Sequence, residues 1–208
     1  MSARESLKNE IINKAVVHGK VILSSGKEAD YYVDLRRITL DHVAAPLVGE
    51  VMLDLTKDLE FDAVGGLTLG ADPVATAMMH VAARNGRALD SFVVRKEGKA
   101  HGLQRRIEGP DVAGKRVLAV EDTSTTGGSV LTAVEALKEA GANIKGMAAI
   151  FTYGFDLAEQ NFKNANVELY TLSNYSNLLN LAVAKTYITE EEQQTLSEWN
   201  VNPSTWNV

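Results

Sequence analysis

The stretch that decides the fold is Val117-Leu118-Ala119-Val120-Glu121-Asp122-Thr123-Ser124-Thr125-Thr126-Gly127-Gly128-Ser129. Its four leading apolar residues are typical of a buried strand, and two adjacent carboxylates follow them. Hydroxyl residues and glycines then run directly into a predicted helix over residues 128–140. Because α/β sheets bind ligands at the carboxyl ends of their strands, this order predicts a ligand site just after residue 120.

The loop after the acid pair has the properties of a phosphate site. Its glycines let the main chain approach a ligand closely, and the backbone N–H groups at the start of a helix attract an anion. Glu121 and Asp122 would repel a phosphate, so they suit the hydroxyl groups of a sugar, or a metal ion held through water. A sugar phosphate satisfies both halves of the motif.

Two nucleotide-binding loops do not fit this stretch, and one structural interpretation stays open. No Gly-Lys-Ser or Gly-Lys-Thr follows, as a P-loop requires, and no G-x-G-x-x-G opens the loop, as a dinucleotide site requires. The structural alternative is a threonine and glycine turn that only caps a helix, although it gives the acid pair at the strand end no purpose.

Segments with helical period alternate with short β-branched runs elsewhere, which predicts an α/β domain with a mainly parallel sheet. Ser2 and Glu5 form a capping pattern that predicts a helix ending at Gly19. The expected strands are 21–23, 31–35, 63–66, 92–94, 115–120, 144–151 and 167–172, and the expected helices are 41–59, 73–84 and 128–140, with two more between 174 and 208. Residues 95–115 have no usable periodicity, which indicates either a functional lid or a wrong assignment.

Composition places the chain among ordinary globular proteins. It has 208 residues, 45% of them hydrophobic, with 21 basic and 27 acidic side chains and a net charge of −6. That balance argues against a broad nucleic-acid surface, and no apolar run reaches the length of a transmembrane helix. The absence of cysteine excludes disulfides, thiolate metal sites and a cysteine nucleophile. Residues 1–10 lack the apolar core of a secretory signal, so we expect a cytoplasmic protein with one domain, residues 1–208.

Residues 117–129 resemble, position by position, the phosphoribosyl pyrophosphate signature of the type I phosphoribosyltransferases. The resemblance implies their α/β fold, a mostly parallel central sheet flanked by helices with a small hood subdomain. It also implies that Glu121 and Asp122 act as catalytic residues that hold the ribose hydroxyls and position C1. The remaining residues of the signature would bind the 5′-phosphate: Thr123, Ser124, Thr125, Thr126, Gly127, Gly128 and Ser129.

A basic loop, Arg95-Lys96-Glu97-Gly98-Lys99-Ala100-His101-Gly102, resembles the mobile hood loop of the orotate phosphoribosyltransferases within that family. Clustered cations can stabilise the charge that develops on a leaving pyrophosphate, and closure of a lid keeps water from the reacting carbon. The resemblance implies that pyrophosphate is bound by Arg95, Lys96, Lys99 and His101, with Lys99 as the main catalytic cation. The alternative is a solvated basic loop without that role.

Two further segments are similar to orotate-specific members. The segment Leu23–Asp34 resembles the part that covers the flat pyrimidine, which implies stacking by Tyr32 and an orotate contact by Lys27. Thr125, in the loop after the acid pair, is a third expected orotate contact. Residues 65–73 resemble the turn that holds pyrophosphate through its backbone. The alternative for the tyrosine is an ordinary strand residue.

Three places depart from the family pattern. Leu69 and Ser24 stand where many members carry lysine, so more of the pyrophosphate charge would be neutralised by Mg²⁺ and the basic loop. Phe151-Thr152-Tyr153-Gly154 stands where many members have an Asp-Arg pair whose arginine reaches the orotate carboxylate. The arginine expected there is therefore missing from this sequence.

The resemblance as a whole implies transfer of the phosphoribosyl group from 5-phospho-α-D-ribose 1-diphosphate (PRPP) to orotate, which gives orotidine 5′-monophosphate and pyrophosphate. It implies Mg²⁺ carried by the substrate, with no metal ligand certain in the protein, and a homodimer whose hood loop serves the partner's active site. The hood is expected at residues 1–40 and parts of 150–208, the core at 41–150 and the mobile loop at 95–110. The alternatives are a phosphoribosyltransferase for another nucleobase and a non-catalytic regulator that keeps the donor pocket.

Overall fold

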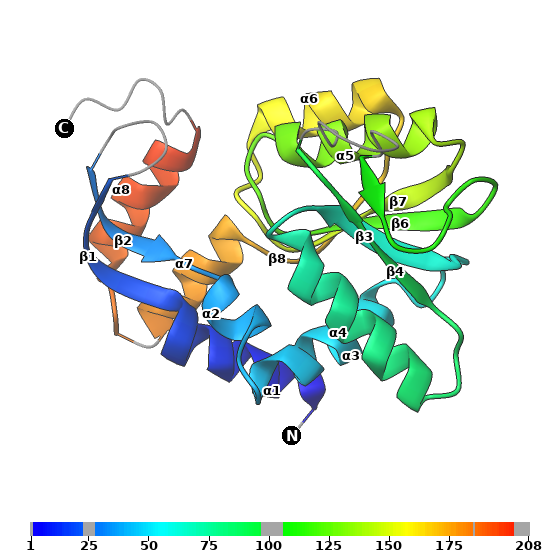
Figure 1. Cartoon of the computed structure of the whole chain (residues 1–208). Coiled ribbons are helices and arrows are strands. Elements are labelled where there is room, and N and C mark those ends of the chain that lie inside the picture. Colours follow the sequence, from blue (N-terminus) through cyan, green and yellow to red (C-terminus); the bar gives the residue numbers. More distant parts are fainter. Residues whose placement is uncertain (1, 23–27, 97–105, 185, 202–208) are drawn as a thin grey trace.

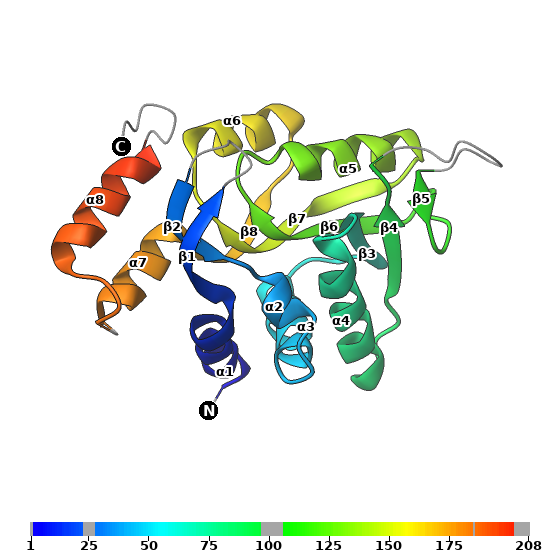
Figure 2. The ribbon, with the colours of Figure 1, turned by 60° about the vertical axis from the view of Figure 1, so that its left-hand side comes forward.

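The computed structural model describes residues 2–22, 28–96, 106–184 and 186–201, and for residues 17–22 and 28–32 it describes the backbone alone. The strands form one sheet of two strands and one sheet of six (Figure 1). The larger sheet carries the acid pair and has helices on both faces (Figures 1 and 2). The predicted α/β class with a mostly parallel sheet is confirmed.

The six-stranded sheet has the order β5-β4-β3-β6-β7-β8, and its edge strand β5 runs antiparallel to β4 while the other pairs are parallel. The strands are β3 (Ala63–Leu67), β4 (Asp90–Val94), β5 (Ile107–Glu108), β6 (Arg116–Ser124), β7 (Asn143–Thr152) and β8 (Leu169–Asn174). Every strand predicted between residues 63 and 172 is present, with ends shifted by up to four residues. Only β5 was not predicted, because two residues give no periodic pattern.

Two layers of helices cover this sheet. The helices α3 (Ala44–Leu55) and α4 (Ala71–Arg84) lie on one face, and α5 (Gly128–Glu139) and α6 (Asp156–Ala165) lie on the other (Figures 1 and 2). Successive strand residues point to opposite faces, so Leu118 and Val120 pack with α3 and α4, while Ala119 packs with α5 and α6. The apolar run of β6 is therefore buried on both faces up to the acid pair.

The first helix begins as predicted and ends earlier. In α1 (Ala3–Glu10), the Glu5 N–H donates to the Ser2 Oγ at 3.2 Å, which is the bond that the capping pattern predicts. A π-helical turn, η1 (Ile11–Ala15), completes the helical segment.

The predicted helix end at Gly19 is wrong, because that residue lies inside a strand. The chain enters β1 (Val16–Ile22), which pairs antiparallel with β2 (Glu28–Val33). The β-branched residues at both ends of β1 favour an extended backbone, and pairing with β2 supplies its hydrogen bonds.

The helix predicted at 41–59 is shorter than expected. Asp41 Oδ1 accepts the N–H groups of Val43 and Ala44 at 2.9 and 3.0 Å, so Asp41 precedes α3 rather than belonging to it. A single-turn helix, α2 (Arg36–Thr39), comes before it and was not predicted.

Two helices, α7 (Tyr175–Ala184) and α8 (Glu190–Val201), confirm the prediction for residues 174–208. By contrast, α6 was not predicted. Its N-terminal boundary residue, Phe155, makes no side-chain cap, and its buried side is carried by two residues, Ala158 and Phe162. A short helix with neither a start signal nor a long apolar stripe is hard to recognise.

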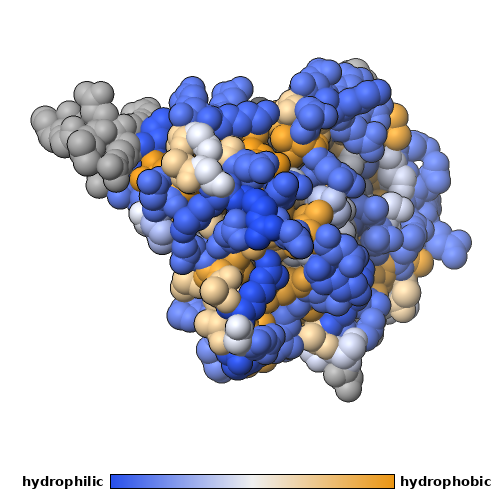
Figure 3. Space-filling view, turned by 90° about the vertical axis from the view of Figure 1, so that its right-hand side faces the viewer, coloured by the Kyte–Doolittle hydropathy of each residue, from blue (hydrophilic) through white to orange (hydrophobic). Residues whose placement is uncertain are grey.

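Hydrophilic side chains predominate on the face shown in Figure 3, with hydrophobic ones scattered between them. Within the described ranges, no helix has both the length and the apolar character needed to cross a membrane. The division into hood, core and mobile loop stays a prediction.

Candidate active site

The acid pair lies within β6 rather than after it. The predicted strand ends at residue 120, but pairing with β7 continues until Ser124 lies opposite Thr152. The polar residues stay in the ladder because β7 extends equally far and supplies their backbone partners. Glu121 is buried, with 7% of its surface exposed, and Asp122 is half-buried. Two carboxyl groups are thus held by a rigid strand at the carboxyl end of the sheet.

Burial raises the pKa of both carboxyl groups, and the charge of Asp122 adds to the shift of Glu121. Burial, followed by the charge of Asp122, raises the pKa of Glu121 to about 8. Burial also raises the pKa of Asp122. The Asp122 N–H donates to Glu121 Oε1 at 3.2 Å, and the Thr123 N–H donates to Asp122 Oδ1 at 2.6 Å. Hydroxyl donors or a cation would relieve the unfavourable charge of this pair.

The turn before α4 packs against the acid pair, and the first turn of α4 adds a third carboxylate, Asp72. A methyl group on Gly70 would overlap the Glu121 carboxylate and come within 2.9 Å of Asp122 Oδ1, so this turn packs directly against the acid pair. Thr68 Oγ1 donates to Asp72 Oδ2 at 2.7 Å. Asp72 Oδ1 is buried and has no hydrogen-bond partner among the described residues.

Sequence analysis placed this turn at the ligand but missed Asp72. Its charge contributes to the raised pKa of Glu121, so it belongs to the same electrostatic cluster. The sequence does contain one indication that Asp72 belongs to the site. It lies in the first turn of a helix that directly follows a strand and a glycine turn, where α/β proteins bind ligands.

Asp34 and Arg36 approach the acid pair from the N-terminal segment. Arg36 Nε lies 3.1 Å from Asp34 Oδ1. Both charges act on Asp122, whose pKa is lowered by Arg36 and raised by Asp34. Arg36 is a functional candidate that sequence analysis missed, because it stands outside the motifs and only the fold brings it to β6.

The loop between β6 and α5 leads directly into a helix N-terminus. Gly127 has a φ of 78°, a left-handed conformation that favours glycine, and α5 begins immediately after it without a side-chain cap. Thr123 is half-buried, and Thr125, Thr126, Gly128 and Ser129 are exposed. Ser124 Oγ is buried and has no hydrogen-bond partner in the described ranges. The first N–H groups of α5 are placed as an anion site requires.

The structure describes only the ends of the predicted basic loop. The Arg95 N–H donates to Arg106 O at 2.8 Å, and its guanidinium lies 3.6 Å from Glu108. Lys96 is exposed. The other predicted residues lie outside what the structure describes: Lys99, His101, Lys27 and the side chain of Tyr32. Their roles stay predictions.

The segment after β7 is aromatic and is held by the C-terminal helix. The Tyr153 ring stacks on Tyr175 at a centroid distance of 5.5 Å and meets the edge of Trp199 in α8 at 6.3 Å. Asn200 Nδ2 donates to Tyr153 O at 3.0 Å, and the Tyr153 N–H donates to Ser124 O at 3.1 Å. An aromatic cluster therefore occupies the place of the missing arginine and links α8 to the end of β6.

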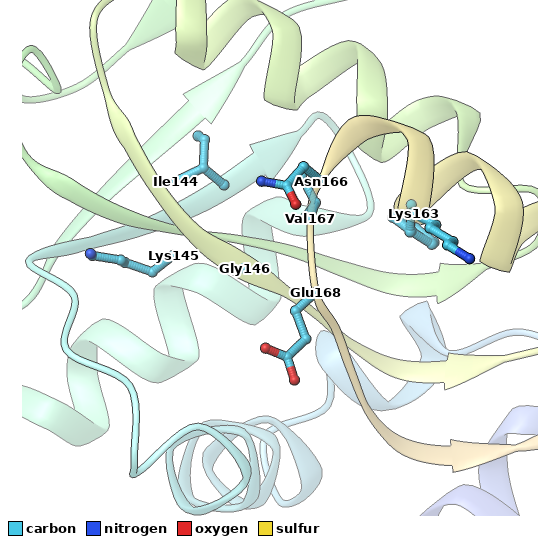
Figure 4. Close-up of a pocket in the computed structure, with 8 residues that line it drawn as sticks. Ile144, Lys145, Gly146, Lys163, Asn166, Val167 and Glu168 are labelled. Carbon is cyan, nitrogen blue, oxygen red and sulfur yellow. The ribbon is translucent and has the colours of Figure 1, made fainter.

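A hollow of about 430 Å³ lies at the opposite end of β7 (Figure 4). It is lined by Ile144, Lys145, Gly146, Phe162, Lys163, Asn166, Val167 and Glu168. Lys145 and Lys163 extend away from each other, so the hollow does not gather their charges (Figure 4). Along β7 it is on the order of 20 Å from the strand's carboxyl end, so it is separate from the acid pair.

Comparison with known proteins supports a functional site at the carboxyl end of the sheet. The family model of the phosphoribosyl transferase domain matches residues 44–170, which include the acid pair, the loop after it and the turn before α4. The chain belongs to the phosphoribosyltransferase family.

Its relatives within this family carry a more specific name. The orotate phosphoribosyltransferase of Streptomyces avermitilis is 70% identical over 157 residues, which are 76% of this chain and 86% of the relative. The solved structure of Mycobacterium tuberculosis H37Rv orotate phosphoribosyltransferase superimposes with a TM-score of 0.77 at 50% identity, covering 85% of this chain and 99% of that chain. A structure of the same protein in complex with PRPP gives a TM-score of 0.73 at 44% identity, covering 85% and 99%. The resemblance to orotate phosphoribosyltransferases is confirmed, together with the predicted fold.

Proposed function

We propose that this chain transfers the phosphoribosyl group from PRPP to orotate and releases orotidine 5′-monophosphate and pyrophosphate. The observation that carries the proposal is the end of β6, where Glu121 and Asp122 stand beside a left-handed glycine that opens a helix. A ribose bearing a 5′-phosphate complements both parts. The 70% identity to an orotate phosphoribosyltransferase supports orotate as the acceptor.

The acid pair and the loop position the donor. The loop Thr123–Ser129 binds the 5′-phosphate through its hydroxyl groups and through the N–H groups at the start of α5. Glu121 and Asp122 accept hydrogen bonds from the ribose hydroxyls, which favours their charged forms and holds C1 in line with the acceptor nitrogen. The reaction then proceeds by orientation and electrostatic stabilisation, without a covalent intermediate on the protein.

The basic loop acts on the leaving group. Arg95, Lys96, Lys99 and His101 bind pyrophosphate, and Lys99 stabilises the charge that grows on it as the bond to C1 breaks. Orotate lies between this loop and the N-terminal segment, where Tyr32 stacks on the ring and Lys27 and Thr125 contact its polar edge.

Mg²⁺ is the proposed cofactor, and the donor set fits it. Magnesium prefers hard oxygen ligands, and Asp72 Oδ1 is buried beside Glu121 without a partner among the described residues. Asp72 would bind the ion, and the acid pair would contact it only through water. Within the described ranges no three acidic, histidine or cysteine side chains are grouped closely enough to hold a metal by themselves, so the ion would be carried mainly by the substrate. When bound, Mg²⁺ neutralises part of the pyrophosphate charge.

The proposed function can be tested by measuring pyrophosphate release with different acceptor bases. We expect release of pyrophosphate that requires orotate and Mg²⁺, and much slower release with uracil or hypoxanthine in place of orotate. The variant Lys99→Ala should lower turnover by well over tenfold, which corresponds to about 2–4 kcal/mol of lost transition-state stabilisation. Absence of orotate-dependent release would end the proposal, and retention on nucleic acid without turnover would favour a regulator.

We further propose a cytoplasmic homodimer in which each basic loop closes over the partner's site. Mixing Lys99→Ala with Asp122→Asn subunits tests this arrangement, because a mixed dimer then contains one site with both native residues. Random exchange should restore about a quarter of wild-type activity, since half of the dimers are mixed and one of their two sites is intact. If each loop serves its own subunit, the mixture stays inactive.

A further inference from the structure

The helix α6 contacts the phosphate loop at two neighbouring residues, Thr126 and Gly127. In Figures 1 and 2 it lies next to α5, whose N-terminus follows this loop. Asn161 Nδ2 donates to Thr126 O at 2.9 Å. One residue further along, the buried Phe162 ring packs against Gly127, where an added methyl group would come within 2.8 Å of Cζ. Two adjacent residues of α6 therefore contact two adjacent residues of the loop.

The hydrogen bond from Asn161 orients a whole peptide group. In a trans peptide the C=O and N–H bonds point in opposite directions, so a Thr126 carbonyl turned toward α6 directs the Gly127 N–H away from it. Gly127 O accepts the Leu131 N–H at 2.9 Å, which is the first bond of α5. Among the described residues, no hydrogen bond is donated by the N–H groups of Gly127, Gly128 and Ser129.

We propose that Asn161 is a positioning residue for the donor's 5′-phosphate, an inference that rests on the function proposed above. It holds the Thr126–Gly127 peptide so that the Gly127 N–H joins the first N–H groups of α5 in one anion site. The amide is bound to the Thr126 carbonyl, so it acts on the phosphate site through the backbone.

If Asn161 had only a structural role, its removal would lower the stability of the fold. The contacts of α6 indicate that this role belongs to Phe162 instead. Phe162 is 3% exposed and supplies the apolar packing between α6 and the loop. Asn161 is half-buried and Thr126 is exposed, so water can replace the lost donor when the amide is removed. Removal of Asn161 should therefore leave the fold intact and weaken only the binding of the donor's 5′-phosphate.

The two ends of PRPP can be tested separately, because ribose 5-phosphate represents one end and pyrophosphate represents the other. For Asn161→Ala, calorimetry should give a Kd for ribose 5-phosphate that is roughly tenfold higher, the effect of one lost hydrogen bond. The Kd for pyrophosphate and the KM for orotate should stay within twofold, while the KM for PRPP rises. Asn161→Asp keeps the size without the donor and should weaken ribose 5-phosphate at least as much. Asn161→Gln keeps the donor and should restore part of the affinity.

The matched control is Asn164→Ala, an exposed asparagine on the same helix. It should leave every constant and the melting temperature unchanged. The proposal is overturned if Asn161→Ala binds ribose 5-phosphate like the wild type, or if it weakens ribose 5-phosphate and pyrophosphate equally. If the wild type binds PRPP without turning over orotate, the proposed function fails while the affinity comparison still tests Asn161. A wild type that binds neither PRPP nor ribose 5-phosphate overturns both.

Discussion

The strands β6 and β7 are neighbours, run parallel and end at the same edge of the sheet, yet their ends carry opposite chemistry. Thr123 pairs with Phe151, and Ser124 pairs with Thr152. At the end of β6 stand two carboxylates and a glycine loop. At the end of β7 stands a cluster of aromatic rings that α8 closes from the other end of the chain.

From this difference we propose that the end of β6 acts on the ligand, while the end of β7 stabilises the fold around the site. Burial destabilises the charged forms of both carboxyl groups of β6, and a bound proton, cation or hydroxyl donor relieves that cost. After β7, the Tyr153 ring stacks on Phe155 and Tyr175, and the Tyr153 N–H donates to Ser124 O. Substitutions at the end of β6 should therefore change activity, and those at the end of β7 should change stability.

The largest effect is expected for Asp122→Asn. It removes a charge that accepts ribose hydroxyls, which should lower kcat/KM at least 100-fold, or by about 3 kcal/mol for hydrogen bonds to a charged group. Folding should be no less stable, because a buried charge next to Glu121 is gone. Initial rates of pyrophosphate release and urea unfolding measure the two quantities.

Asp58→Asn is the control for this prediction, since Asp58 is an exposed aspartate away from the site. It should leave kcat/KM within twofold. An Asp122→Asn protein with nearly wild-type kcat/KM would contradict the assignment of β6 as the strand that acts on the ligand.

The next largest effect concerns Trp199, which lies in the aromatic cluster of β7. Trp199→Ala should lower the free energy of unfolding by about 2 kcal/mol, less than a fully buried tryptophan would lose because the ring is half-buried. The KM for PRPP should change less than threefold. Trp199→Phe keeps an aromatic ring against Tyr153 and should recover most of the stability. A large rise in the PRPP KM at unchanged stability would reverse the division between the strand ends.

A smaller effect is expected from pH. The pKa of Glu121 is about 8 in the folded chain and near 4.5 when unfolded, so the folded state holds the proton more tightly. Stability is then greatest below the unfolded pKa and falls as pH rises toward 8. Between pH 5.5 and 7 the wild type should lose roughly 2 kcal/mol relative to Glu121→Gln, since one pKa unit corresponds to about 1.4 kcal/mol. Urea midpoints at both pH values measure the loss, and parallel curves for the two proteins would contradict it.

The fold could be predicted from the sequence where its determinants are contiguous. The thirteen residues from 117 to 129 contain the strand, the acid pair, the loop and the helix start, so one local pattern predicted the fold and the position of the candidate site, whose residue roles stay predictions. Partners that come from distant segments could not be predicted in this way. Asp72 and Arg36 reach the acid pair only after folding, and the cluster at Tyr153 depends on Trp199, 46 residues later.

The smallest effect distinguishes two glycines that follow the two strands. Gly127 and Gly154 have φ values of 78° and 69°, so alanine at either position costs about 1 kcal/mol of backbone strain. A methyl group on Gly127 would also press on the buried Phe162 ring, whereas among the described residues nothing lies within 4 Å of one on Gly154. Gly127→Ala should therefore cost about 1 kcal/mol more than Gly154→Ala in urea unfolding, the usual scale of overpacking.

The cause of that difference can be tested in the same experiment. In a Phe162→Leu background the smaller side chain leaves room for the added methyl group, so the extra cost of Gly127→Ala should disappear while the strain common to both glycines stays. PRPP affinity should fall for Gly127→Ala and not for Gly154→Ala, because only Gly127 lies in the phosphate loop and contributes its N–H group there. Equal costs for the two glycines would mean that α6 yields at this contact and that the loop after β6 is no more tightly braced than the segment after β7.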